Sequence, residues 1–111
     1  MLKERLDVAK KAYVILNKHC NDFILESYLF GSTAKRCVNE DSDVDILIIG
    51  KYEKNLELIN RISRLFETLE QDTNIEINVV YYNVDKFKEL LKDGATFIRS
   101  IESSCIKLSE L

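Results

Sequence analysis

The residues best suited to chemistry lie in one stretch of the chain, GSTAKRCVNEDSDVDILII. A glycine-serine pair, Gly31-Ser32, follows an apolar run, and after ten further residues Asp43 and Asp45 open the next apolar run. Residues two apart on a strand point to the same face, about 7 Å apart, so both carboxylates are expected to project together. Their mutual repulsion raises their pKa values unless a cation lies between them. Mg²⁺ suits the pair, because it commonly combines one or two carboxylates with substrate phosphates.

The turn before the acid pair is predicted to hold the phosphates of a nucleoside triphosphate. Gly31 has no β-carbon, so the backbone can approach a phosphate closely. Ser32 is expected to cap a short helix at 33–37 whose free N–H groups favour anions. Lys35 and Arg36 lie in the same loop and could neutralise phosphate oxygens, although both can equally be plain surface charges.

Glu76 is the candidate for a third acid beside the pair. It lies early in the run IEINVV, on the polar face that it shares with Asn78. If that strand neighbours the strand of Asp43 and Asp45, the Glu76 carboxylate could complete a metal site or accept a proton from an attacking hydroxyl. The alternative is an exposed strand residue without a role.

The elements that would position these residues follow from hydrophobic periodicity and from turn signals. The expected helices are 2–20, 33–37, 54–70, a short one between Asn83 and Gly94, and a last one carrying Phe97, Ile98 and Ile101; the expected strands are 24–30, 44–49 and 75–82. This order predicts an α/β (α+β) fold, with helices packed on a small mixed sheet of about three to four strands. The absence of proline, repeats and linker-like segments predicts a single domain over 1–111.

Composition excludes several classes of protein. The net charge of -3 gives no overall basic field, so direct nucleic-acid binding is not expected. The longest apolar run, 46–49, is too short to span a membrane, and the charged N-terminus does not resemble a signal peptide; both predict a cytoplasmic protein. Three widely spaced cysteines and one histidine indicate reduced thiols and no zinc site.

The segment GSTAKRCVNEDSDVDILI resembles the signature of the DNA polymerase beta-like nucleotidyltransferase superfamily: Gly-Ser, ten residues, Asp-x-Asp. The length and the tail FIRSIESSCIKL look like those of the minimal nucleotidyltransferases, the antitoxin partners of HEPN-domain toxins. The resemblance implies Mg²⁺-dependent transfer of AMP from ATP to a hydroxyl, typically a tyrosine, of a HEPN ribonuclease bound in a hetero-oligomer. By position, Gly31-Ser32 would hold the triphosphate and Asp43 and Asp45 the metal, with Glu76 as the third acid.

The chain departs from the family pattern at two places. Many relatives carry Arg-Gly where this chain has Lys35-Arg36, and their third acid is often aspartate rather than glutamate. These departures keep a second hypothesis open, an antitoxin with a weak or inactive site that neutralises its toxin by binding alone. A third, transfer to a small molecule such as an aminoglycoside, is disfavoured because such relatives need a further domain to hold the acceptor.

Overall fold

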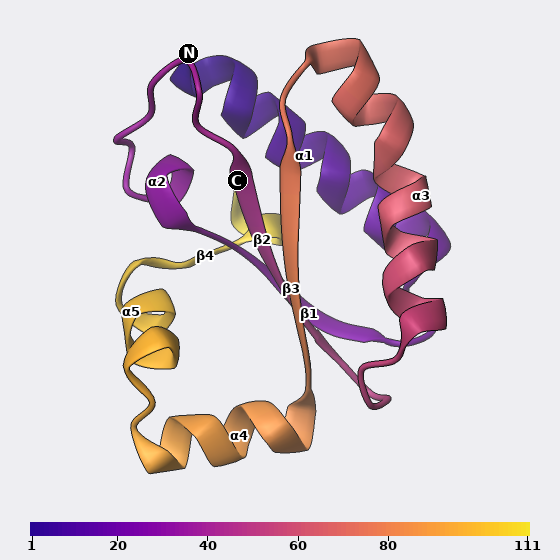
Figure 1. The fold of residues 1–111 in the computed structure, drawn as a ribbon, viewed down its shortest axis with the longest axis vertical. Helices are drawn as coiled ribbons and strands as arrows, with labels where there is room; N and C mark the ends of the chain where they lie inside the picture. Colours follow the sequence, from indigo (N-terminus) through magenta and orange to yellow (C-terminus); the bar gives the residue numbers. More distant parts are fainter.

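Two long helices cover one face of a four-stranded sheet in the computed structural model, which describes residues 1–111 throughout. The helices are α1 (Leu2–His19) and α3 (Leu56–Thr73), which lie side by side in Figure 1. The strands are β1 (Ile24–Phe30), β2 (Val44–Gly50), β3 (Ile77–Asn83) and β4 (Ile106–Lys107), in the spatial order β3-β2-β1-β4. Only β2 and β3 pair in parallel, so the sheet is mixed and the predicted fold class is confirmed.

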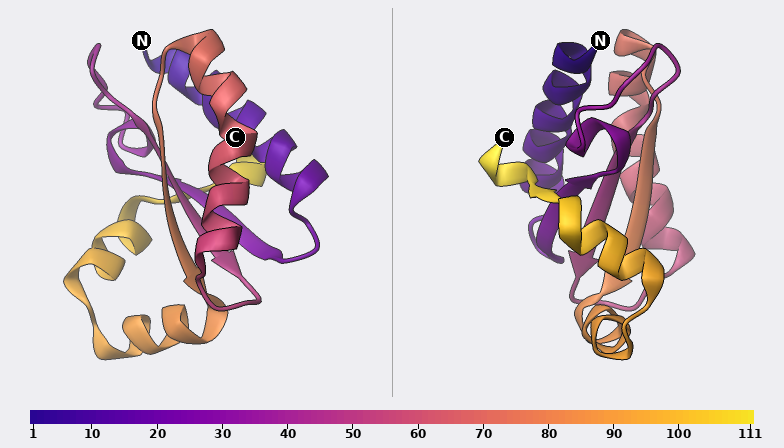
Figure 2. Two further views of the ribbon diagram at one scale, coloured as in Figure 1. Left: turned by 45° about the vertical axis from the view of Figure 1, so that its right-hand side comes forward. Right: turned by 90° about the vertical axis from the view of Figure 1, so that its left-hand side faces the viewer.

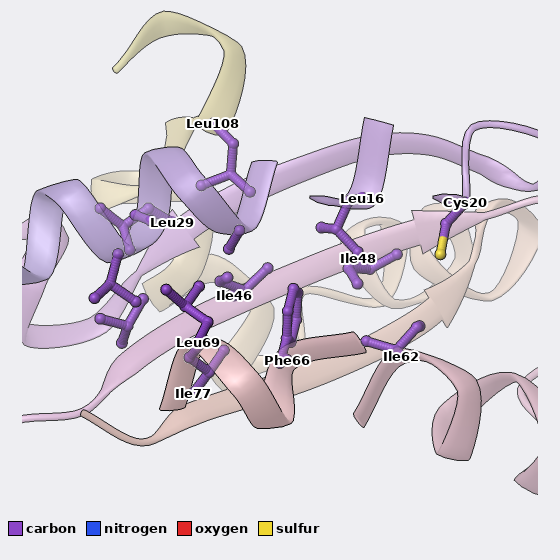
Figure 3. Packing of buried hydrophobic residues seen from close by; sticks show 14 of the residues in the cluster. Leu16, Cys20, Leu29, Ile46, Ile48, Ile62, Phe66, Leu69, Ile77 and Leu108 are labelled. Atoms are coloured by element: carbon purple, nitrogen blue, oxygen red, sulfur yellow. The ribbon is translucent and has the colours of Figure 1, made fainter. Parts of the chain in front are cut away.

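The central strand β2 is buried on both faces, which explains its nearly unbroken apolar sequence. Val44, Ile46 and Ile48 face the main core, where apolar residues of α1 and α3 meet the sheet (Figure 3). Leu47 and Ile49 face the opposite side, in a smaller cluster. Because side chains alternate along a strand, Asp45 lies on the same face as Leu47 and Ile49.

Two shorter helices, α4 (Val84–Asp93) and α5 (Thr96–Ser104), belong to this second face. Figure 1 and the left view of Figure 2 both place α5 across the strands from α1. Asn83 caps α4 by accepting the Lys86 N–H, and Gly94 ends the helix at a φ of 70°. Both boundary predictions are confirmed.

Several predicted boundaries are wrong by a few residues. The helix expected at 33–37 is the single turn α2 (Gly31–Ala34), which begins after Phe30 and has no side-chain cap, so Ser32 is not its N-cap. Helix α3 runs on to Thr73 and ends where Asn74 adopts a left-handed conformation; the Thr73 hydroxyl donates to the Leu69 carbonyl within the last turn.

The third strand starts at Ile77 rather than at 75, because its parallel pairing with β2 begins at Val44. The two-residue strand β4 and the 3₁₀ turn η1 (Leu108–Glu110) were not predicted, since so short a strand carries no alternation to detect. All three cysteines are free thiols, as expected. None of the helices combines the length and the hydropathy that crossing a membrane requires.

Candidate active site

Asp43 and Asp45 converge on a single hydrogen-bond donor. Asn78 on β3 stands directly opposite Asp45 in the parallel register. Its amide nitrogen Nδ2 donates to Asp43 Oδ2 at 3.0 Å and to Asp45 Oδ1 at 3.1 Å. The two carboxylates therefore share one face, as their spacing predicts, at the point where the chain enters the sheet.

The surroundings of the Asp45 carboxyl disfavour its ionised form. It is half-buried, and burial raises its pKa above the usual 3.8, with the neighbouring Asp43 charge adding to the rise and the Asn78 hydrogen bond opposing it. A carboxylate that is both desolvated and next to a like charge is stabilised by a cation. The acid pair is thus poised to bind a positive charge.

The Gly31 backbone packs directly against Asp45. Phe30 pairs with Asp45 across β1 and β2, which brings the following residue next to the carboxylate. A β-carbon on Gly31 would lie 2.2 Å from Asp45 Oδ2, and its φ is +72°. The lack of space for a β-carbon and the left-handed backbone both require glycine at position 31.

Thr33 ties this turn to the acid strand. Its side chain is fully buried, and its Oγ1 donates to the Asp43 carbonyl at 3.2 Å. The Ser32 carbonyl accepts the Cys37 N–H at 2.9 Å, which closes the loop after α2. Because α2 is only one turn long, its dipole is small, and the turn contributes its shape and its backbone rather than a helix field.

Lys35 and Arg36 are exposed beside this turn and form no ion pair with any acid. Arg36 has a φ of 60°, in the left-handed region that favours glycine. The predicted basic loop is therefore present and free to meet an anion, with Arg36 held in a strained backbone conformation.

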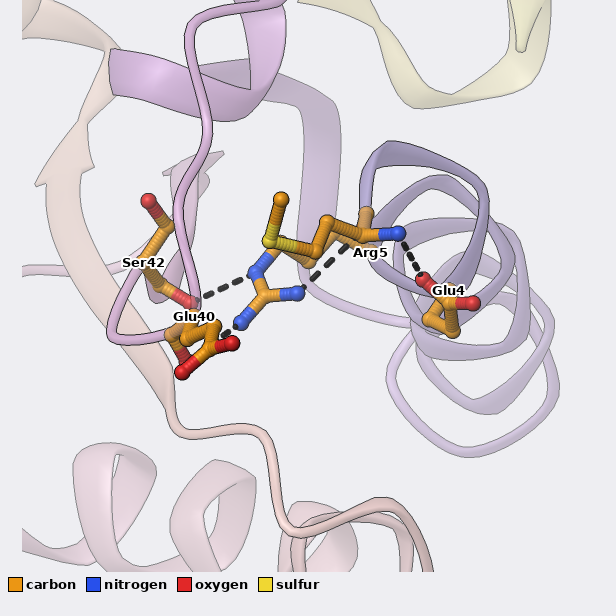
Figure 4. A network of polar contacts seen from close by, with 5 residues as sticks. Glu4, Arg5, Glu40 and Ser42 are labelled. Carbon is orange, nitrogen blue, oxygen red and sulfur yellow. Dashed lines mark hydrogen bonds and ion pairs between the residues drawn. The ribbon is translucent and has the colours of Figure 1, made fainter.

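Arg5, which sequence reasoning missed, fixes the loop that leads into Asp43. It is buried on α1, and its Nε donates to the Ser42 carbonyl at 2.8 Å and its Nη2 to the Glu40 carbonyl at 3.0 Å (Figure 4). Its Nη1 also donates to the Met1 carbonyl at 3.1 Å. The sequence did contain a signal for the role of Arg5, because this arginine lies on the apolar stripe of α1, one turn before the buried Val8.

Glu76 lies near the pair without joining it. It is exposed in the connection just before β3, and its backbone carbonyl accepts the Val44 N–H at 2.9 Å. It lines a polar pocket together with Asp43 and Arg5. No three acidic, histidine or cysteine side chains are arranged to hold a metal ion. The third side chain at the acid pair is Asn78, to which sequence reasoning gave no role; that of Glu76 stays a prediction.

The family model described as "Polymerase beta, Nucleotidyltransferase" matches residues 10–100. The chain belongs to this nucleotidyltransferase family. The match spans the first two strands, the Gly31 turn, the acid pair and the strand of Asn78. Membership supports transferase activity.

Solved structures share the fold of this nucleotidyltransferase. A candidate nucleotidyltransferase from Sulfolobus solfataricus is 20% identical over 96% of this chain and 80% of that chain, with a TM-score of 0.58. A toxin–antitoxin with AMP-PNP is 18% identical over 89% and 71%, with a TM-score of 0.61. A mutant form of the toxin–antitoxin MntA–HpeT is 18% identical over 87% and 68%, with a TM-score of 0.57. No curated protein sequence matches the chain significantly.

The acid pair of this nucleotidyltransferase fits a divalent cation with oxygen ligands. Asp43 Oδ2 and Asp45 Oδ1 both lie within hydrogen-bond distance of one nitrogen, so one small group can engage both oxygens. Mg²⁺ accepts such carboxylate oxygens and completes its shell with phosphates and water. The close Gly31 backbone leaves no side chain over the Asp45 carboxylate.

Proposed function

We propose that this nucleotidyltransferase is an antitoxin that transfers AMP from ATP to a hydroxyl, that of a tyrosine, on a HEPN ribonuclease toxin and thereby silences it. The observation that carries the proposal is the convergence of Asp43 and Asp45 beside the Gly31 backbone, in a member of this family. Two solved toxin–antitoxin structures, one with AMP-PNP, share the fold and support this class of partner and nucleotide.

The residues have separate roles in this reaction. Asp43 and Asp45 would hold Mg²⁺, which when bound supplies neutralisation of phosphate charge near the reacting phosphorus. The Gly31-Ser32 turn brings its backbone alongside that position, and the exposed Lys35 and Arg36 can meet the remaining phosphate oxygens.

The transfer itself is a substitution at the α-phosphorus. The acceptor oxygen forms a bond to the α-phosphorus. The bond between the α-phosphorus and the oxygen that bridges it to the β-phosphorus breaks, and pyrophosphate leaves. The hydroxyl proton must pass to a base, and Glu76, exposed in the pocket that it shares with Asp43, is the candidate.

Label transfer tests the proposal. The chain, a co-encoded partner protein, Mg²⁺ and ATP labelled at the α-phosphorus should give label on the partner. The variant with Asp43→Ala and Asp45→Ala should abolish it. A matched control with Glu67→Ala and Asp72→Ala removes two exposed acids from α3 and should keep it. Absence of label with the unmodified chain, while the two proteins form a complex, would contradict the proposal.

An antitoxin that acts by binding alone is the second candidate. It is favoured because no third acidic side chain joins Asp43 and Asp45 to form a metal-binding group. The same double variant separates the two functions. If it protects cells from the toxin as well as the unmodified chain does at equal expression, then complex formation suffices and transfer is not required.

A further inference from the structure

Asn78 occupies a position that determines what the acid pair can bind. Its side-chain amide has two N–H groups, and one nitrogen reaches both carboxylates, at 3.0 Å and 3.1 Å. The parallel register sets this arrangement, because Asn78 stands opposite Asp45 and on the same face of the sheet. The amide thus holds the two acids in place before any cation arrives.

We propose that Asn78 is a positioning residue for the Asp43–Asp45 pair and that its neutral amide limits this site, in the absence of nucleotide, to one divalent cation. The proposal rests on the proposed function, since it concerns the metal of the same site. Asn78 then fixes the direction in which both carboxylates point and the number of cations that they hold.

The limit of one cation follows from charge. Without nucleotide, two carboxylates balance one divalent ion, and a second ion beside the first would meet strong repulsion because neither a phosphate nor a third carboxylate offsets its charge. Glu76 does not supply that charge in this structure, because it lies outside β3 and forms no metal-binding set with the pair. The group opposite Asp45 is an amide, whose oxygen is a neutral ligand.

A single change tests this limit. Asn78→Asp keeps the size of the side chain and places a third carboxylate opposite Asp45, so it should convert the site into one for two cations. Asn78→Ala removes the bridge and adds no charge, so it should keep one cation but bind it several-fold more weakly. Asn60→Asp, on an exposed position of α3, adds the same charge far from the pair and serves as the control.

The experiment is titration of the full chain with Mn²⁺ alone, in which the spectroscopic signal of free Mn²⁺ reports the number bound. The unmodified chain and the Asn60→Asp control should bind one ion, and Asn78→Asp should bind two. Two ions on the unmodified chain, or one ion on a folded Asn78→Asp chain, would overturn the proposal. If Asn78→Asp does not fold, unchanged Mn²⁺ affinity in Asn78→Ala would overturn it.

The outcome also separates this inference from the proposed function. An unmodified chain that binds no Mn²⁺ contradicts the inference but not AMP transfer, because Mg²⁺ can still enter the site together with the phosphates of ATP. An unmodified chain that binds two ions contradicts the inference alone and leaves AMP transfer standing, to be judged by the label on the partner.

Discussion

The α-carbon of Gly31 faces the Asp45 carboxylate so closely that an added β-carbon would lie 2.2 Å from Oδ2. Real side chains do not approach so closely, and the carboxylate concerned is the one whose other oxygen, Oδ1, meets Asn78 beside Asp43. The turn and the acid strand therefore form one unit, which the Thr33 hydrogen bond to the Asp43 carbonyl reinforces.

Gly31→Ala should destabilise the fold and also abolish cation binding. The left-handed φ alone costs an alanine about 1–2 kcal/mol, and the methyl group must displace the Asp45 carboxylate. Gly94→Ala is the matched control, because Gly94 has a φ of +70° and faces only the flexible end of Arg99. Denaturation and Mn²⁺ titration of both variants check this. Mn²⁺ binding by Gly31→Ala at the unmodified affinity would contradict it.

Asp45→Asn should make the fold more stable near pH 7 while removing a metal ligand. Burial and the Asp43 charge raise the Asp45 pKa above 3.8, so the folded chain holds this proton more tightly than the unfolded chain. Stability therefore falls as the pH rises from 3.8 to the raised pKa, and the penalty then stays constant. Urea unfolding should show a gain for Asp45→Asn near pH 7 that vanishes below pH 3.8. The exposed Asp41→Asn should show no such gain, and an equal gain would refute this assignment.

Arg36→Gly should raise stability and lower nucleotide affinity at once. The φ of 60° at Arg36 costs a non-glycine residue about 1 kcal/mol, and glycine relieves it, whereas the lost guanidinium can no longer meet a phosphate. Arg36→Ala separates the effects, since it removes the charge and keeps the strain. Thermal unfolding and titration with AMP-PNP measure both. Unchanged affinity in the two variants would show that Arg36 is a plain surface charge.

Arg5→Met should loosen the loop before Asp43. It leaves three carbonyls without their donor, and loss of bonds to a buried charged group should cost about 2–4 kcal/mol. Arg5→Lys should recover part of this, because an ammonium keeps the charge but not the fork of donors. Urea unfolding measures the change in stability, and weaker Mn²⁺ binding would show that the loop before Asp43 has lost its fixed position. If Arg5→Met unfolds at the same urea concentration as the unmodified chain, this role of Arg5 is contradicted.

Much of the fold was predictable because it depends on local pattern. The apolar stripes of α1 and α3, the Asn83 cap and the alternation at the start of 75–82 specify their elements without distant information. The shared face of Asp43 and Asp45 followed from the two-residue period of a strand.

The remainder depends on which strands pair and in which register. Asn78 meets Asp45 only because β3 runs parallel to β2 from Val44 onwards, and no local signal sets that register. The role of Arg5 likewise depends on a loop 37 positions further along the chain. No local signal predicts the left-handed conformation at Arg36, because that conformation is typical of glycine.

Calorimetric titration of the chain with AMP-PNP tests whether Asp43 and Asp45 hold the metal that carries the nucleotide. With Mg²⁺ present, the unmodified chain and an exposed-acid control, Glu67→Gln with Asp72→Asn, should bind AMP-PNP equally. Binding should weaken at least about tenfold, roughly 1.4 kcal/mol, when EDTA removes the metal or when Asp43→Asn and Asp45→Asn are combined. Equal affinity in all four titrations would contradict a nucleotide–metal site at this pair.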